Sequence, residues 1–261
     1  MGWQPAVNRL PGMIDGSDGR ASGMGRGLFL IAAREPVAGF TKTRLGATIG
    51  MERAAALYAA FLVDLAARFT PCAGDDWGFD VGWAFTPAEV DFASVLTGIG
   101  CAAPPSSIRF VPQHGDGWDV RQANILRWSH AQGYARTILV GSDSPQLRHS
   151  TICDAFTALV NHDVAMGRTV DGGYYLIGLR GFHDVLTGLP MSTTSAADAL
   201  AARAVALGLR LTELPETFDV DEERDLEQLR AALMPDGEAA PATWAALRRL
   251  GLLKLVSEKV L

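Results

Sequence analysis

A short apolar run that ends in an aspartate is the clearest sign of chemistry in this sequence. Residues 137–141 are typical of a buried strand, and Asp143 follows them just before a proline at position 145. Ligands bind at the carboxyl ends of parallel strands, because the chain turns away there and leaves a crevice. Asp143 could therefore hold a metal ion or a sugar-phosphate, or it could cap the helix expected to begin near His149.

Three further clusters of polar residues follow or interrupt the expected strands. They are Arg34 with Lys42 and Arg44, Asp171 with Gly172 and Gly173, and Asp219 with Asp221. Carboxylates from separate loops can converge on Mg²⁺ or Mn²⁺, hard cations that take oxygen ligands and share them with substrate phosphates. Lysine and arginine side chains can neutralise the same phosphates.

Each of these clusters also has a purely structural interpretation. Lys42 and Arg44 could form a solvated charge pair, Asp171 and Gly172 an ordinary hairpin turn, and Asp221 the cap of the following helix. The motifs taken one at a time leave both interpretations open.

Several common site motifs are absent. Residues 39–43, Gly-Phe-Thr-Lys-Thr, place Thr41 where a P-loop needs its second glycine, and no Gly-x-Gly-x-x-Gly follows the first strand. Ser142 and Ser144 do not stand in the Gly-x-Ser-x-Gly motif of a nucleophilic hydrolase. The sequence thus argues against a P-loop ATPase, a nicotinamide dehydrogenase and a serine hydrolase.

The hydrophobic pattern predicts alternating strands and helices, which position these clusters. Strands are expected at 28–33, 81–85, 108–111, 137–141, 163–167, within 169–179 after the paired glycines, and at 209–214. Helices are expected at 52–69, 120–132, 150–161, 196–207, 222–233 and 242–258, and residues 35–48 are expected to be a loop. This order predicts an α/β domain with a mainly parallel central sheet flanked by helices.

Composition limits the possible functions. The chain has 261 residues, 48% of them hydrophobic, which suffices for one large α/β domain, and its formal charge of −6 argues against a nucleic-acid partner. Three cysteines without a Cys-x-x-Cys pair suggest neither disulfides nor zinc and fit the reducing cytoplasm. No apolar run near the start is long enough to cross a membrane, so we expect no membrane partner.

Three segments are expected along the chain. Residues 1–26 are rich in glycine and lack an apolar period, which predicts a flexible leader. Residues 27–234 would form the α/β domain, and 235–261 a linker and C-terminal helix. The apolar face of that helix could dock on its own domain or on a partner, of which we favour the first, and the oligomeric state is not readable from the sequence.

Taken in order, four motifs resemble the DUF2064 family, from about Leu28 to Leu233. They are Arg34-Glu35-Pro36-Val37-Ala38-Gly39-Phe40-Thr41-Lys42-Thr43-Arg44-Leu45, Gly141-Ser142-Asp143-Ser144-Pro145, Asp171-Gly172-Gly173-Tyr174-Tyr175-Leu176-Ile177-Gly178 and Asp219-Val220-Asp221. The resemblance implies a GT-A-like, nucleotide-diphospho-sugar transferase fold. Where the family commonly has Leu-Gly-Glu-Arg this chain has Trp118-Asp119-Val120-Arg121, and Gly167-Arg168 replaces a Gly-Pro.

The resemblance also implies roles for single residues. Asp143, with Asp219 and Asp221, would hold Mg²⁺ or Mn²⁺. Nucleotide and phosphate groups would be bound by Arg34, Gly39, Lys42, Arg44, Gly172 and Gly173. Asp171 would bind sugar hydroxyls or act as a catalytic base.

Three functions follow as hypotheses. The first is a metal-dependent glycosyltransferase that moves a sugar from a nucleotide-sugar donor to a small-molecule acceptor. A second is a nucleotidyltransferase that releases pyrophosphate from an NTP. The third, motivated by Trp118 and Arg168, is a nucleotide-binding regulatory protein without turnover. Base, sugar, acceptor and stereochemistry are not determined by the sequence.

Overall fold

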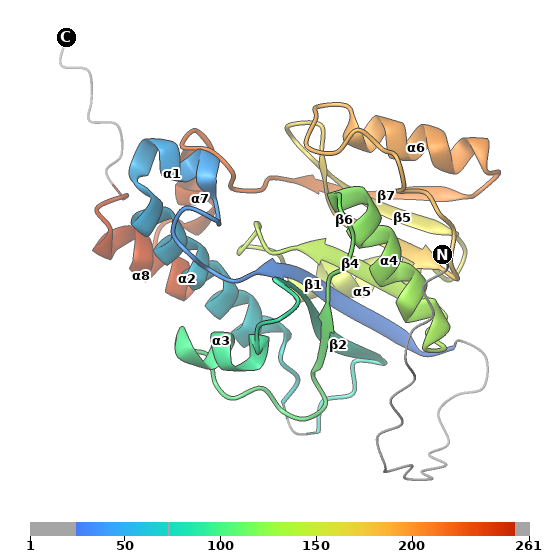
Figure 1. Cartoon of the computed structure of the whole chain (residues 1–261), viewed down its shortest axis with the longest axis horizontal. Helices are drawn as coiled ribbons and strands as arrows, with labels where there is room; N and C mark the ends of the chain where they lie inside the picture. The colour runs from blue at the N-terminus through green and yellow to red at the C-terminus, as the bar shows by residue number, and fades with distance from the viewer. Residues whose placement is uncertain (1–24, 73, 254–261) are drawn as a thin grey trace.

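A seven-stranded sheet flanked by helices forms a single α/β domain in the computed structural model, which describes residues 25–72 and 74–253 (Figure 1). The strands are β1 (Gly27–Arg34), β2 (Phe79–Thr86), β3 (Arg109–Pro112), β4 (Arg136–Gly141), β5 (Val164–Thr169), β6 (Tyr174–Arg180) and β7 (Leu211–Thr217). The helices are α1 (Thr43–Ile49), α2 (Met51–Phe69), α3 (Phe92–Gly98), α4 (Trp118–Ala131), α5 (His149–Ala158), α6 (Ala196–Ala206), α7 (Asp225–Leu233) and α8 (Pro241–Arg249).

The order of the strands sets the position of the site. It is β3-β2-β1-β4-β6-β5-β7, and only β6 runs against its neighbours β4 and β5. From β1 the chain proceeds outward to β2 and β3 and then returns to β4 on the other side of β1. Neighbouring loops therefore leave in opposite directions between β1 and β4, which opens a crevice at their carboxyl ends.

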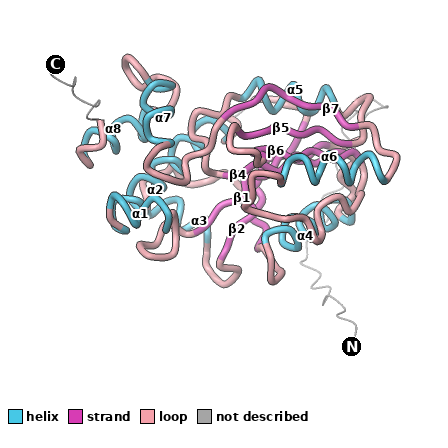
Figure 2. Tube along the Cα trace, turned by 90° about the horizontal axis from the view of Figure 1, so that it is seen from above, coloured by secondary structure: helices cyan, strands magenta, loops and turns pink. Residues whose placement is uncertain are grey.

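Both faces of the sheet are buried, which explains why its strands are apolar without alternation. In β1, Leu28, Leu30 and Ala32 face one core, while Phe29 and Ile31 face the other. The first core is covered by α4 and α6 and the second by the remaining helices. Figure 2 shows α4 and α6 on one side of the strands and α5 on the other. The mainly parallel sheet predicted from the sequence is confirmed.

The last described helix docks on its own domain, as expected. The buried Asp64 carboxylate of α2 accepts hydrogen bonds from the backbone N–H groups of Ala242 (2.9 Å) and Thr243 (2.7 Å), and so caps the first turn of α8. Leu247 and the neighbouring Trp244 then pack into the second core.

Several elements differ from those predicted. Residues 35–48 are not all loop, because α1 begins at Thr43, and α3 lies in a stretch that shows no clear period in the sequence. Helix α7 begins at Asp225 and not at 222. The C-terminal helix ends at Arg249. The end of the predicted range 242–258, and the leader except for residues 25 and 26, lie outside the described residues. No helix within the described ranges has the length and apolar character needed to cross a membrane.

One carboxylate ties together the far ends of three strands. Asp163, just before β5, accepts hydrogen bonds from the backbone N–H of Arg210 (3.0 Å) and from the guanidinium groups of Arg210 (3.2 Å) and Arg180. These bonds, the backbone one first, hold the pKa of Asp163 well below its usual range. Stability from this group is therefore present above the unfolded pKa of about 3.9 and is lost as the pH falls below it.

The Asp163→Asn variant should lose about 2 kcal/mol of unfolding free energy at pH 7, because charge-assisted hydrogen bonds are replaced by weaker ones. That loss should shrink as the pH falls below 4. Denaturant titrations at several pH values measure it. The control variant is Asp198→Asn, which changes an exposed partner of Arg168. Its loss of unfolding free energy should stay below about 1 kcal/mol. An equal loss for Asp163→Asn at pH 3 and pH 7 would contradict the assignment.

Candidate functional site

The loop after β1 places a buried lysine at the crevice. Lys42, just before α1, has left-handed backbone angles (φ 52°, ψ 45°), which cost a non-glycine residue about 1–2 kcal/mol. Its side chain is only 5% exposed. Such a conformation persists only where the surroundings fix it, and it is typical of functional sites. Lys42 is thus not part of a solvated charge pair.

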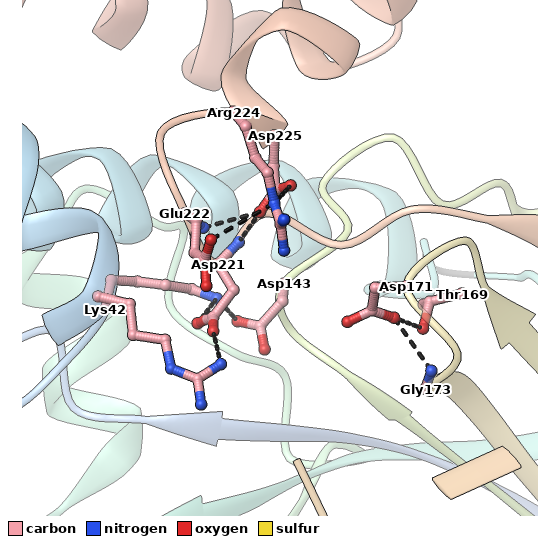
Figure 3. Close-up of polar contacts among 10 residues, drawn as sticks. Lys42, Asp143, Thr169, Asp171, Gly173, Asp221, Glu222, Arg224 and Asp225 are labelled. Carbon is pink, nitrogen blue, oxygen red and sulfur yellow. Dashed lines mark hydrogen bonds and ion pairs between the residues drawn. The ribbon is translucent and has the colours of Figure 1, made fainter. Parts of the chain in front are cut away.

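Carboxylates from two other loops meet this lysine (Figure 3). The Nζ atom of Lys42 lies 2.7 Å from Oδ1 of Asp143, which follows β4, and 3.8 Å from Oδ1 of Asp221, which follows β7. Nη1 of Arg44 lies 3.0 Å from Oδ2 of Asp221. Residues 42, 44, 143 and 221 therefore form one network of two cations and two anions.

Backbone contacts hold the two acidic loops together. The N–H of Val220 donates to the carbonyl oxygen of Asp143 (3.0 Å), and Oγ of Ser144 donates to the carbonyl oxygen of Phe218 (2.8 Å). The Asp225 carboxylate at the start of α7 accepts from the N–H of Asp221 (2.9 Å). Neither aspartate caps a helix: α5 has Arg148 and α7 has Arg224 at the N-cap position. The capping interpretations of Asp143 and Asp221 were wrong.

Asp219 lies beside this network and is the most perturbed carboxyl group of the crevice. Burial, with the nearby charges of Asp143 and Asp171, raises its pKa to about 6, and the Lys42 ammonium counteracts them. The charges of Asp143 and Asp171, from two other loops, therefore disfavour ionisation of Asp219. A cation bound among the three carboxyl groups would reduce this repulsion.

The loop between β5 and β6 contributes Asp171. Its Oδ1 accepts hydrogen bonds from Oγ1 of Thr169 (2.6 Å) and the N–H of Gly173 (3.0 Å), which fixes the carboxylate at the turn. The other oxygen points toward the side where Asp143 lies in Figure 3. The hairpin interpretation is correct, and the same turn presents a carboxylate to the crevice.

Tyr58, on the buried face of α2, links β1 to the loop after β4. The hydroxyl of Tyr58 accepts a hydrogen bond from the N–H of Arg34 at the end of β1 (3.0 Å) and shares one with Oγ of Ser142 after β4 (2.7 Å). Burial first, and Asp143 second, raise its pKa above the usual value, so it stays neutral. Periodicity alone cannot separate such a residue from the core.

Two adjoining cavities meet at this network. The first, of about 410 Å³, is lined by Arg34, Lys42, Arg121 and the ends of β1 and β4. The second, of about 580 Å³, is lined by Asp171, Asp219, Tyr174 and the segment 191–194. Both are lined by Arg44, Trp118, Gly141, Asp143, Ser192 and Asp221. Most of the basic residues thus line the first cavity and most of the acidic ones the second, which Arg44 and Arg224 also line.

Most predicted site residues line one or both cavities, but Gly39 and Gly172 line neither. Arg34 lines the first and Gly173 the second, on the side away from Lys42. Gly39 lies in the turn before α1 (φ 79°), and Gly172 packs under the segment 191–194. Trp118, Tyr58 and Ser192 line the cavities without having been predicted as site residues.

No set of three His, Cys, Asp or Glu side chains is arranged as a metal cage within residues 25–72 and 74–253. In this conformation the Lys42 ammonium lies against Asp143 and near Asp221. The oxygen donors of Asp143, Asp219 and Asp221 are nevertheless of the kind that Mg²⁺ and Mn²⁺ prefer.

Comparison with solved structures defines the fold class. A structure from Desulfovibrio desulfuricans G20, described as a candidate nucleotide-diphospho-sugar transferase, matches with a TM-score of 0.76 and 27% identity, over 88% of this chain and 97% of that chain. The chain therefore has a nucleotide-diphospho-sugar transferase-like fold. A cytidylyltransferase from Leptospira borgpetersenii serovar Hardjo-bovis (strain JB197) is less similar, with a TM-score of 0.49 and 11% identity over 88% of this chain and 97% of that chain.

Residues 84–193 match the family model "Uncharacterized protein conserved in bacteria (DUF2064)". The match includes Asp143, Asp171 and both glycines that follow Asp171. The resemblance to this family found in the sequence is thereby confirmed. No curated protein matches the chain.

Gly172 should be indispensable for the second cavity. A Cβ atom there would lie 2.0 Å from the carbonyl oxygen of Thr194, at a φ of +92°. Gly172→Ala should therefore destabilise the protein by more than about 2 kcal/mol, from overpacking and backbone strain together. The matched control is Gly133→Ala, with a φ of +87° and no atom within 4 Å, which should cost about 1 kcal/mol. Equal losses in denaturant titration would show that Thr194 does not press on Gly172.

Proposed function

We propose that this protein is a metal-dependent transferase that moves a sugar from a nucleotide-sugar donor to a small acceptor. One observation carries the proposal: Lys42 and Arg44 face Asp143 and Asp221 at the switch point of the sheet, where two cavities meet. Open α/β sheets bind nucleotides at this point, and a transfer reaction needs room for a donor and an acceptor on either side of one centre.

The first cavity has the charge that a diphosphate requires. Arg34, Lys42, Arg44 and Arg121 line it, against the carboxylates of Asp143 and Asp221. Lys42 and Arg44 would bind the diphosphate and stabilise the negative charge that grows on it as the sugar departs. The ammonium group of Lys42 would exchange part of its contact with Asp143 for phosphate oxygen.

The carboxylates of Asp143, Asp219 and Asp221 are candidate ligands for a divalent cation, which would draw them together, since the described residues hold no preformed set of three ligands. They are hard oxygen donors on loops that are hydrogen-bonded to each other, and burial first, with the charges of Asp143 and Asp171, raises the pKa of Asp219. Bound Mg²⁺ or Mn²⁺ would act as a Lewis acid on the diphosphate. The side chains of Lys42 and Arg44 would orient the donor.

Asp171 faces the second cavity from a rigid turn. Its free oxygen could accept a hydrogen bond from an acceptor or sugar hydroxyl, or remove its proton as a general base.

The description of the D. desulfuricans structure supports sugar transfer, at 27% identity over most of both chains. A nucleotidyltransferase on the same scaffold would use the same basic side chains for an NTP and would release pyrophosphate. A regulatory protein without turnover would bind nucleotide and form no product. An assay for pyrophosphate and for free NDP separates these three functions.

Replacing Asp143 tests the metal and donor proposals together. UDP, GDP, ADP and dTDP, their glucose or mannose conjugates and the matching NTPs would be tested by thermal shift, with and without Mg²⁺ or Mn²⁺. An NDP-sugar should raise Tm only with metal, because ligand binding to the native state stabilises it by mass action. In Asp143→Asn that shift should disappear.

The control for this test is Asp154→Asn, on an exposed position of α5 that lines neither cavity. Its ligand-dependent shift should equal that of the native protein. A larger shift with an NTP than with any NDP-sugar would favour nucleotidyl transfer. No shift with any nucleotide would refute nucleotide binding.

Lys42 should be needed for diphosphate affinity. In Lys42→Met the side chain keeps its length and loses its charge, so the affinity for NDP should fall at least about tenfold, the loss expected for one charge-assisted hydrogen bond. Isothermal calorimetry with NDP and Mg²⁺ measures it. Arg249→Met, an exposed position of α8, should leave the affinity unchanged. Unchanged affinity in Lys42→Met would exclude Lys42 as a phosphate ligand.

A further inference from the structure

A single aromatic side chain stands where the two cavities meet. Of the six residues that line both, Trp118 alone is aromatic, and the others include Asp143, Asp221 and Arg44. Trp118 is 38% exposed, so part of its apolar surface is open to a crevice that charged side chains also line. Scattered apolar side chains on a surface need no explanation, but one inside a polar cleft marks a place where a ligand buries it.

The backbone around Trp118 is fixed before any ligand binds. Trp118 is the first residue of α4, and the carboxylate of the next residue, Asp119, accepts a hydrogen bond from the N–H of Gly188 (2.8 Å). One turn later, Nε2 of Gln122 donates to the hydroxyl of Tyr174 (2.9 Å), across the second cavity. The start of α4 is thus held to residue 188 and to β6. Because the backbone is held, only the side-chain torsions of Trp118 have to be fixed when it binds a ligand.

The two sides of the junction differ in polarity in a way that suits a sugar ring. Asp143 and Asp221 offer oxygen acceptors for hydroxyl groups, and Trp118 offers a π face. A pyranose has hydroxyl groups around its edge and weakly positive C–H groups on its faces. The negative face of an indole attracts such C–H groups, as it attracts the positive edges of other rings.

On the basis of the proposed function, we propose that Trp118 is a specificity-determining residue that packs against the ring of the group being transferred. Lys42 and Arg44 would hold the diphosphate in the first cavity, so the group attached beyond the diphosphate must pass the junction to reach the second. Trp118 would then distinguish a nucleotide sugar from the bare nucleotide, and a ring from an acyclic group.

The test compares the affinities of NDP and NDP-sugar in the same protein. With Mg²⁺ present, isothermal calorimetry would use UDP with UDP-glucose, GDP with GDP-mannose, ADP with ADP-glucose and dTDP with dTDP-glucose. For the pair that binds, Trp118→Ala should weaken NDP-sugar binding about fivefold to tenfold, as expected for loss of one aromatic contact. NDP binding should change less than twofold, and Trp118→Phe should retain most of the NDP-sugar affinity.

Phe40 provides the matched control. It is 73% exposed and lines the first cavity but not the second. Phe40→Ala should therefore leave the ratio of the two affinities unchanged. Equal weakening of NDP and NDP-sugar in Trp118→Ala would mean that the indole contacts the nucleotide, and no weakening of either would mean that it contacts neither; both results overturn the proposal.

Fluorescence gives a second measurement that does not depend on the alanine variant. The chain has six tryptophans. NDP-sugar, and not NDP, should change the emission, and Trp118→Phe should abolish that change. Persistence of the change in Trp118→Phe would overturn the proposal. If the native protein binds neither NDP nor NDP-sugar, the proposed function fails, and the role of Trp118 fails with it. If the native protein binds NDP, and Trp118→Ala leaves the ratio of the NDP and NDP-sugar affinities unaltered, only the role of Trp118 is refuted.

Discussion

The contact between Lys42 and Asp143 is the interaction on which the crevice depends. It joins the loop after β1 to the loop after β4, where the order of strands reverses between these two neighbours. The lysine is nearly buried and adopts a strained backbone conformation, so its position costs free energy that the two carboxylates must offset. Removing Asp143 would leave the nearly buried Lys42 ammonium with the more distant Asp221 carboxylate (3.8 Å) as its counter-ion.

Around this pair the charges separate into two groups. Arg34, Lys42 and Arg121 line the first cavity alone, and Asp171, Asp219, Glu222 and Arg224 line the second alone, while Arg44, Asp143 and Asp221 line both. This uneven division of charge would orient the proposed donor, which is negative at one end and hydroxylated at the other. The hydrogen bonds between the loops at 143–146 and 218–221 keep the division rigid, because neither loop can move alone.

Most strands and helices were predictable because their pattern reflects burial. Strand β1 is apolar at every position that faces either core, and α2 repeats apolar residues at spacings of three and four. Helix α1 was missed because Pro36 and Gly39 indicate a loop and the helix starts after a left-handed residue. Helix α3 is one short stretch with two fully covered apolar side chains, Phe92 and Leu96, too few to make a period.

The α/β class, the mainly parallel sheet and the four polar clusters after its strands could be read from the sequence alone. Those features are local, since periodicity and chain breakers act over a few residues. The folded chain was needed to see that Asp143 pairs with Lys42 instead of capping α5, that Tyr58 bridges β1 and β4, and that Trp118 lies between two cavities. These contacts join residues tens of positions apart, and they form only because the strand order brings β1 and β4 together.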